Sequence, residues 1–236
     1  MPELNGETTG LAHVVALVRE RVTVQYTRAD QSAAHRMDHI ERVLANARAI
    51  AVHFPEADME ILTLAALLHD VTSPFDRKEQ HVKLSINTAK RILNGIRYPP
   101  ERAERVLAII AEHSTDDLKA GDLSSVEARI LFDADKIDGM GPCGIARAFT
   151  QFGQRGRAPP VAVTWYRKKI ETAVRNMKTD PGRAMAEERL PYLRDFLHRF
   201  DEENDPEPAG GKPTLSGAWV IRPGQTGQRE GEIDDR

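Results

Sequence analysis

The sequence predicts an all-α fold, a compact bundle of several helices. Apolar residues recur at spacings of three and four along most of the chain before Asn204, which is the period of a helix with one buried face. No segment alternates apolar and polar residues with a turn dipeptide at its end, as the strands of a sheet do. Prolines and glycines interrupt the periodic segments, so we expect separate helices with short connections.

The first half of the chain contains four such segments. An apolar stripe in LAHVVALVRERV predicts the first helix, and HIERVLANARAIAVHF, followed by Pro55, predicts the second. A third helix is expected over residues 57–69, because Pro74 forbids a long continuation. A fourth is expected over residues 79–93, where NGIRYPP breaks the pattern.

The second half continues in the same way. ERAERVLAIIAEHS opens after Pro100, and LSSVEARILFDADKI has Ser124 or Ser125 as a candidate N-cap. Two longer helices are expected in VTWYRKKIETAVRNM and GRAMAEERLPYLRDFLHRF, and we interpret the basic run WYRKKIETAVRNMK as a solvated helix face. The bundle should occupy residues 1–203. Residues 204–236 are rich in Pro, Gly and charge and should form a disordered tail.

Composition excludes several classes of function. The chain has 236 residues, 29% of them charged, and a net charge of −3, so neither sequence-specific nucleic-acid binding nor binding to an anionic membrane is expected. The single cysteine, Cys143, cannot form an internal disulfide, and the polar N-terminus lacks the apolar core of a signal peptide. The strongest apolar run, Ile61–Leu68, is too short to span a membrane. We therefore expect a cytoplasmic protein.

Histidines and aspartates follow two of the apolar runs. His69 and Asp70 end ALLHD, while ILFDADKID carries three carboxylates, and His39 lies on the amphipathic helix before them. A buried carboxylate is costly unless it is paired or bound to a metal, so these segments favour one shared site. Two imidazoles and two carboxylates suit a divalent ion such as Mn, Co, Ni, Fe, Zn or, less well, Mg. A lone cysteine argues against a structural zinc site.

The ordered residues H…HD…D, within HIERV, AALLHDV and DADKID, resemble the signature of the HD-domain metal-dependent phosphohydrolases. GPCGIARAF resembles the segment that follows in small, stand-alone bacterial HD hydrolases, and the resemblance covers about residues 30–200. It implies an all-α HD bundle with a divalent metal between its helices, bound by His39, His69, Asp70 and Asp135, with His69 and Asp70 also catalytic. The register, a ligand followed by a basic and then an aliphatic residue, favours Asp135 over its rivals Asp133 and Asp138.

Further polar residues are candidates for substrate binding. His35 lies one turn before His39 and should approach the same cleft, unless it is a helix cap or a surface residue. His81 and His113 could bind a substrate phosphate or a second metal, or could simply end their helices. Lys136 and Arg147 could hold phosphate oxygens, or could form surface ion pairs.

Departures from the family pattern narrow the predicted activity. Ser73 and Pro74 occupy the places where hydrolases of the stringent-response alarmone carry an acidic pair, and the HD-GYP stretch is absent. The chain therefore resembles small hydrolases acting on nucleotides, including nucleoside triphosphate pyrophosphohydrolases. We predict hydrolysis of a phosphate ester or anhydride in a small phosphorylated substrate, and a homo-oligomer is possible. The alternatives are a metal-binding regulatory or interaction module with little turnover, and an HD-fold di-iron oxygenase that also uses His81 and His113.

Overall fold

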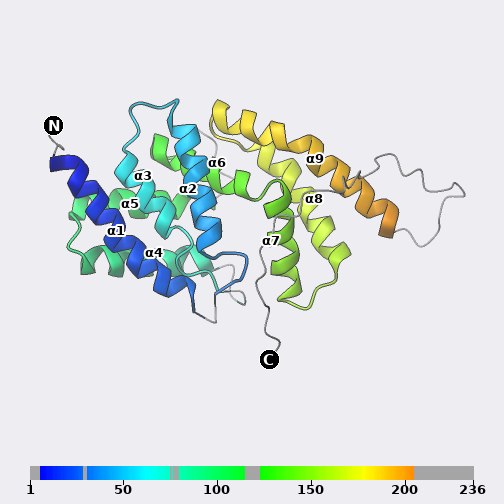
Figure 1. Cartoon of the computed structure of the whole chain (residues 1–236), viewed down its shortest axis with the longest axis horizontal. Coiled ribbons are helices and arrows are strands. Elements are labelled where there is room, and N and C mark those ends of the chain that lie inside the picture. The colour runs from blue at the N-terminus through cyan, green and yellow to red at the C-terminus, as the bar shows by residue number, and fades with distance from the viewer. Residues whose placement is uncertain (1–5, 29–30, 75, 77–79, 115–122, 205–236) are drawn as a thin grey trace, which may run out of the picture. The chain divides into compact units, whose positions relative to one another are not determined.

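The computed structural model describes residues 6–28, 31–74, 76, 80–114 and 123–204, and in these residues the all-α prediction is confirmed (Figure 1). The only extended pairing within them is an isolated bridge between Gln31 and Pro74. The helices are α1 (Gly6–Tyr26), α2 (Met37–Ala51), α3 (Met59–Leu68), α4 (His81–Gly95), α5 (Pro100–Glu112), α6 (Val126–Asp138), α7 (Pro142–Gly153), α8 (Pro159–Arg175) and α9 (Asp180–Asn204).

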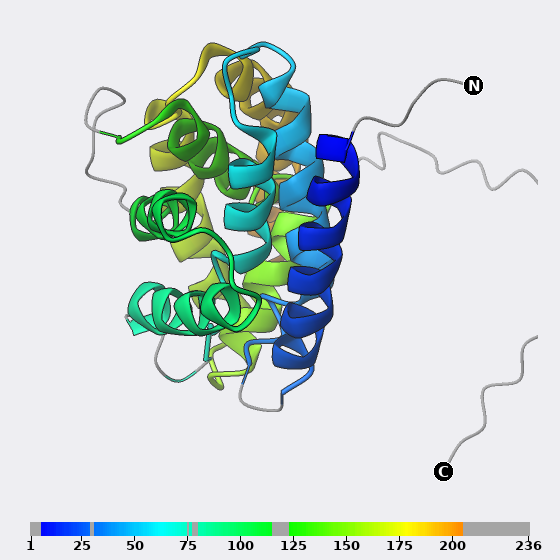
Figure 2. The ribbon, with the colours of Figure 1, turned by 90° about the vertical axis from the view of Figure 1, so that its left-hand side faces the viewer.

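Helix α3 lies in the centre of the first group of helices. Every residue from Ile61 to Leu68 is buried, because α1, α2, α5 and α6 pack around this short helix. Figure 2 shows α1 lying along one side of α3. The Asp58 carboxylate caps the N-terminus of α3 by accepting hydrogen bonds from the backbone N–H groups of Glu60 and Ile61. The apolar run therefore holds its C-terminal residue, and the residues that follow it, deep in the bundle.

Helix α6 joins this first group of helices to α9. It packs against α2, α3 and α5 on one side and against α9 on another, and α8 in turn packs on α7 and α9. Its N-cap is Ser125 rather than Ser124, because the Ser125 hydroxyl accepts a hydrogen bond from the backbone N–H of Ala128. Most of α6 is buried, including two of its three aspartates. Its polar residues must therefore find partners inside the protein.

Helix α7 is an element that the helical periodicity did not predict. Gly141, with a φ of 86°, and Pro142 at the first helical position make the turn from α6 into α7. Gly144 lies so close to Gly139 that a Cβ atom there would be 2.2 Å from the Gly139 carbonyl oxygen. These residues are typical of a loop when they are read from sequence alone, which is why the segment was not expected to be helical.

The remaining predicted boundaries are close to those observed. Helix α3 begins at Met59 rather than at residue 57, and α4 begins at His81 rather than at residue 79. Asn204 is the last residue of α9, whereas the sequence assigned it to the tail. The rest of the predicted disordered tail, residues 205–236, lies outside the described residues. No helix in the described part of the chain has the length and apolar character needed to cross a bilayer.

Candidate metal centre

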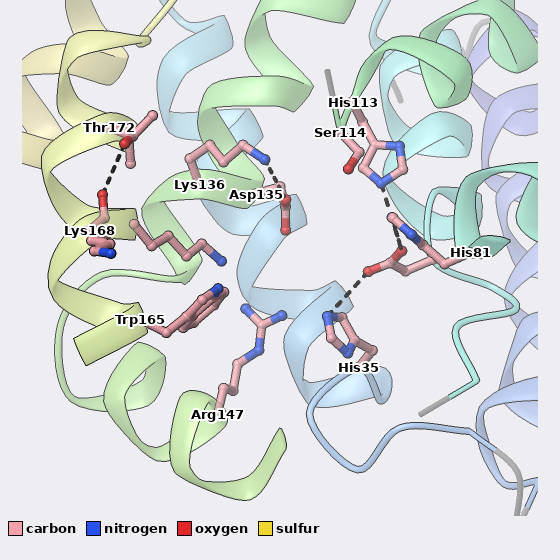
Figure 3. Close-up of a pocket in the computed structure, with 13 residues that line it drawn as sticks. His35, His81, His113, Ser114, Asp135, Lys136, Arg147, Trp165, Lys168 and Thr172 are labelled. Carbon is pink, nitrogen blue, oxygen red and sulfur yellow. Dashed lines mark hydrogen bonds and ion pairs between the residues drawn. The ribbon is translucent and has the colours of Figure 1, made fainter. Parts of the chain in front are cut away.

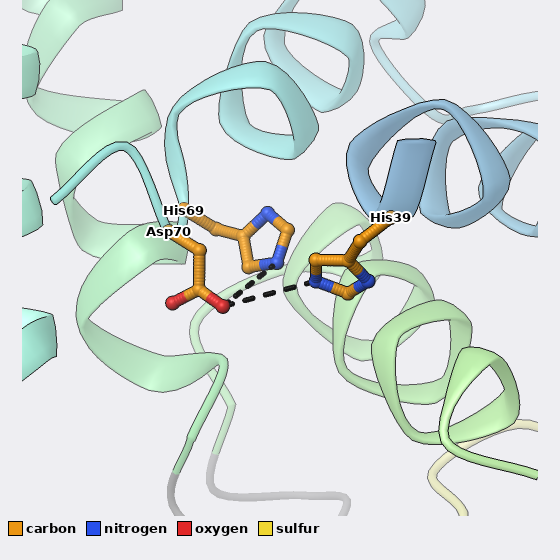
Figure 4. Close-up of side chains that lie close together, drawn as sticks. All are labelled: His39, His69 and Asp70. Atoms are coloured by element: carbon orange, nitrogen blue, oxygen red, sulfur yellow. Dashed lines mark ion pairs between the residues drawn. The ribbon is translucent and has the colours of Figure 1, made fainter. Parts of the chain in front are cut away.

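Four of the predicted site residues meet between α2, α3 and α6, and Figure 4 shows three of them, His39, His69 and Asp70. His39 comes from α2, His69 and Asp70 follow α3 directly, and Asp135 comes from α6. The Nε2 atom of His39 lies 3.8 Å from Oδ2 of Asp70 and 3.6 Å from Oδ1 of Asp135. The Nε2 atom of His69 lies 3.8 Å and 3.9 Å from the same two oxygens. Two imidazole nitrogens and two carboxylate oxygens therefore converge on one point.

The orientation of both histidine rings is fixed by a hydrogen bond at Nδ1, the ring nitrogen that faces away from the centre. Nδ1 of His39 lies 2.8 Å from the Asp138 carboxylate, and Nδ1 of His69 lies 2.8 Å from the carbonyl oxygen of Ala66. Because both partners are acceptors, each Nδ1 donates its proton and each Nε2 presents a lone pair to the centre. A metal-binding histidine is held in the same way, with its outer nitrogen bonded to a carboxylate or carbonyl.

Several side-chain atoms of this centre have no hydrogen-bond partner. Nε2 of His39 and Nε2 of His69, two of the four converging atoms, are buried and make no hydrogen bond, and neither does Oδ1 of Asp70, which faces His81 and His113. Buried polar atoms are nearly always satisfied, so these unsatisfied atoms favour a bound ion at the centre. Ligand atoms of His39, His69 and Asp70 lie within 4.8 Å of one another. The residues present thus fit a divalent cation with mixed nitrogen and oxygen ligands.

Electrostatics of the centre agree with this fit. Burial lowers the pKa of His69 to about 4, so its imidazole is neutral at neutral pH and able to bind a metal. Burial alone would raise the pKa of Asp70, but the surrounding histidines, His69 foremost, hold it well below its usual value. Burial likewise opposes ionisation of Asp135, and Lys136 together with the two histidines outweighs it. The centre thus combines ionised carboxylates with a neutral imidazole, His69.

The structure distinguishes the three aspartates of α6. Asp133 accepts hydrogen bonds from the backbone N–H groups of Lys178 and Thr179, each at 2.8 Å, and from the Thr179 hydroxyl at 2.7 Å. Its carboxylate therefore faces the turn between α8 and α9. Asp138 accepts from His39, and only Asp135 offers its oxygens beside the two Nε2 atoms.

The other predicted histidines also approach Asp70. Nε2 of His35 lies 3.7 Å from Oδ2 of Asp70, while Nε2 of His81 and Nε2 of His113 lie 3.8 Å and 3.7 Å from Oδ1. His81, His113 and Asp70 form a second group able to hold a cation, and it shares Asp70 with the first group. Nδ1 of His113 is held 2.6 Å from the carbonyl oxygen of Ile110. Burial opposes charge on His113, but the adjacent Asp70 carboxylate outweighs it and raises the pKa.

A pocket of about 370 Å³ opens beside this centre (Figure 3). One end of it is lined by His35, His81 and His113 and by the carboxylates of Asp70 and Asp135. The opposite wall carries cations and an aromatic ring, contributed by Lys136, Arg147, Trp165, Lys168 and Lys169. Lys136 lies with Nζ 4.0 Å from Oδ2 of Asp135 and 4.9 Å from the centre of the Phe132 ring.

The interpretation of WYRKKIETAVRNMK as a solvated face was wrong for one side of α8. Trp165, Lys168, Lys169 and Thr172 line the pocket, and Lys169 Nζ lies 5.0 Å from the centre of the Trp165 ring. The i, i+3, i+4, i+7 spacing of these residues was visible in the sequence and marks one helix face. What the sequence did not show is that this face lies opposite the histidines, because that depends on how α8 packs on α7 and α9.

An all-α bundle whose centre offers imidazoles and carboxylates to a divalent cation defines a metal-dependent hydrolase. The HD domain matches residues 36–140, which include all four converging residues. The uncharacterized protein YpgQ of Bacillus subtilis is 31% identical over 189 residues, covering 78% of this chain and 91% of YpgQ. The chain therefore belongs to the HD-domain family, and it is a metal-dependent phosphohydrolase.

Several solved structures are similar to this chain over most of its length. A structure of Bacillus subtilis YpgQ in complex with ADP has a TM-score of 0.63 and 28% identity, covering 83% of this chain and 97% of that one. An HD-superfamily hydrolase from Bacillus thuringiensis has a TM-score of 0.59 and 25% identity, with coverage of 83% and 97%. A protein from Lactobacillus plantarum has a TM-score of 0.66 at 23% identity, with coverage of 81% and 96%, and shares the fold.

Proposed function

We propose that this phosphohydrolase cleaves a phosphate ester or anhydride of a nucleotide. The observation that carries the proposal is the polarity of the pocket, with three histidines and the carboxylates of Asp70 and Asp135 at one end and a cationic wall with an aromatic ring at the other. A nucleotide has matching chemistry, a chain of anionic phosphates joined to a flat base. The ADP bound in the structure of the related YpgQ supports this class of ligand.

His39, His69, Asp70 and Asp135 are the residues that would hold the cation. A divalent cation bound there polarises a phosphoryl oxygen and makes water a better nucleophile at neutral pH. His69 and Asp70, both buried and both directly after α3, are proposed as catalytic because they would hold the cation against the reacting phosphate. Their burial fixes them in position, which favours a single productive geometry.

Other residues of the pocket would bind and orient the substrate. Lys136, Arg147 and Lys168 carry donors suited to phosphate oxygens. Trp165 offers a ring on which a base can stack, as aromatic side chains do for unpaired bases. The Asp70 carboxylate raises the pKa of His113, which favours the protonated form that would donate to the departing oxygen.

The direct test is to purify the chain with Mn or Co and to assay a panel of mono-, di- and triphosphates. We expect metal-dependent release of phosphate or pyrophosphate, and we expect His69→Ala to lose both bound metal and activity. Activity that persists in His69→Ala after its metal is lost would contradict the mechanism. The exposed His198→Ala, on α9 and away from the pocket, is the matched control.

A regulatory or interaction module would behave differently. All residues proposed for catalysis lie between His35 and Lys168, so deletion of residues 205–236 should leave turnover almost unchanged. Absence of turnover on every nucleotide, together with a partner lost on this deletion, would favour the module instead.

A di-iron oxygenase is the alternative that would need a second metal site. Asp70, His81 and His113 form a group that could hold that second ion. Two irons per chain and product formation that depends on oxygen would favour that function over phosphate hydrolysis. Elemental analysis of protein purified without added metal, followed by assays with and without oxygen, separates the two.

A further inference from the structure

Asp138 is a buried carboxylate that contacts both halves of the site. Its side chain, 2% exposed, lies at the last turn of α6. One oxygen, Oδ2, accepts a hydrogen bond from Nδ1 of His39 at 2.8 Å and another from Nη1 of Arg147. The second oxygen, Oδ1, accepts a bond from Nε of Arg42 at 2.6 Å. All of these donors come from residues outside α6.

The contact with His39 determines which ring nitrogen carries the proton. Because a carboxylate only accepts, Nδ1 must donate, and in the neutral ring Nε2 then carries the lone pair. That Nε2 is the atom that lies 3.8 Å from Asp70 and 3.6 Å from Asp135. If Asp138 were absent, the ring could protonate on Nε2 or rotate, and either change would remove a lone pair from the centre.

The contact with Arg147 reaches the substrate side. Arg147 lines the cationic wall of the pocket, and its Nε also donates to the carbonyl oxygen of Ala34 at 2.7 Å. The guanidinium is therefore held at two points, by Asp138 and by the segment just before His35. A cation fixed in this way loses little side-chain freedom when it binds a phosphate.

We propose that Asp138 is a positioning residue that orients His39 for metal binding and Arg147 for substrate binding. It does not face the converging ligand atoms, so it acts through these two side chains. The inference rests on the proposed function of the same site, because metal and phosphate are the two ligands that it would align. Arg42, which also pairs with Asp38, supplies further charge to keep the buried carboxylate paired.

A merely structural role for Asp138 has to be separated from this one, and Asp133 provides the matched control. It lies on the same helix, is fully buried, and accepts three hydrogen bonds from the turn between α8 and α9. Asp133→Asn should lower stability as any damaged buried network does. It should leave Mn²⁺ affinity within about twofold, because the Asp133 carboxylate bonds Lys178 and Thr179 and no residue of the metal centre.

The first measurement is Mn²⁺ affinity by calorimetry in the absence of substrate. Asp138→Asn should bind Mn²⁺ about 10- to 100-fold more weakly than the wild type, the usual effect of losing the residue behind a metal-binding histidine. Asp138→Glu should recover part of this affinity, because both oxygens of a carboxylate accept, whereas Asn offers one accepting oxygen to three donors. Arg147→Gln should keep Mn²⁺ affinity but raise the KM of whichever nucleotide is hydrolysed, with kcat less affected.

The second measurement needs no variant. Nitrogen-15 NMR of metal-free wild-type protein, at a pH where the ring carries one proton, should find that proton on Nδ1 of His39, and a neutral ring protonated on Nε2 would overturn the inference even if Asp138→Asn fails to fold. Equal losses of Mn²⁺ affinity in Asp138→Asn and Asp133→Asn would also overturn it. If Mn²⁺ binds as expected but no nucleotide is hydrolysed, the proposed function fails while the orienting role of Asp138 toward His39 stands.

Discussion

Oδ1 of Asp70 lies 3.7 Å from Nε2 of His113, so the loop after α3 faces the end of α5 directly. This distance is too long for a hydrogen bond and short enough for a cation to bind both groups. His113 therefore has two possible roles to test. It could be a ligand to a second cation, or it could donate a proton to the departing oxygen.

We predict that His113→Gln keeps one metal per chain and loses activity. If His113 donates a proton to the departing oxygen, kcat should fall by about 10²-fold, the lower end of the range for a general acid. Elemental analysis and steady-state kinetics on the same preparation measure both quantities. A drop from two metals to one in the variant would show that His113 is a ligand to a second cation.

We predict that the metal-free protein loses stability as the pH falls from about 6.5 to about 4. Folded His69 has a pKa of about 4 because it is buried, whereas an unfolded histidine titrates near 6.5. Between these values the unfolded chain binds more protons than the folded one, so stability is full above the window and falls as the pH falls through it. Urea unfolding in the presence of a chelator, at several pH values, measures the slope.

The control for this pH dependence is His69→Gln, which removes the titrating group. Its stability should fall less steeply across the same window, although the variant starts from a lower value. Identical slopes for the two proteins would mean that His69 is not held neutral in the folded state.

We predict that Lys168→Ala weakens substrate binding through the cationic wall of the pocket. KM should rise by about 3- to 10-fold at low salt, and the effect should shrink at high ionic strength because Lys168 is exposed and screened. Lys90→Ala, an exposed lysine on α4 that does not line the pocket, should leave KM unchanged. Equal effects of the two variants would indicate general attraction rather than a binding residue.

We predict that Gly144→Ala destabilises the turn that brings α7 against α6. A Cβ atom at this position would lie 2.2 Å from the oxygen and 2.3 Å from the carbon of the Gly139 carbonyl, and this backbone cannot move aside cheaply. The cost should be about 3 kcal/mol in the free energy of unfolding. Gly153→Ala, at the other end of α7 with nothing within 4 Å, should be neutral or slightly stabilising.

Sequence reasoning worked where local pattern determines structure. The apolar run of α3 predicts a buried helix whatever its neighbours are, and the residues at its end must then lie inside the protein. His39, His69, Asp70 and Asp135 were identified through an ordered signature, and they are brought together here. Their roles as ligands remain predictions for metal analysis to test.

Sequence reasoning failed where structure depends on distant neighbours. Helix α7 contains Gly144 near its start, which lowers its local helix propensity, and this glycine allows close packing on the end of α6. Trp165 and Lys169 were assigned to a solvated face because the run around them is charged. Their true position follows from the packing of α8 on α7 and α9, which no local pattern encodes.

The three carboxylates of α6 make this helix sensitive to changes in length. Asp133, Asp135 and Asp138 point to the start of α9, to the metal centre and to the back of His39, respectively. Each residue turns an α-helix by about 100°, so inserting or deleting one residue between Asp133 and Asp135 would rotate the last two away from their partners while the first kept its own. Relatives of this protein should therefore vary in the lengths of their loops but keep the six-residue span from Asp133 to Asp138 free of insertions.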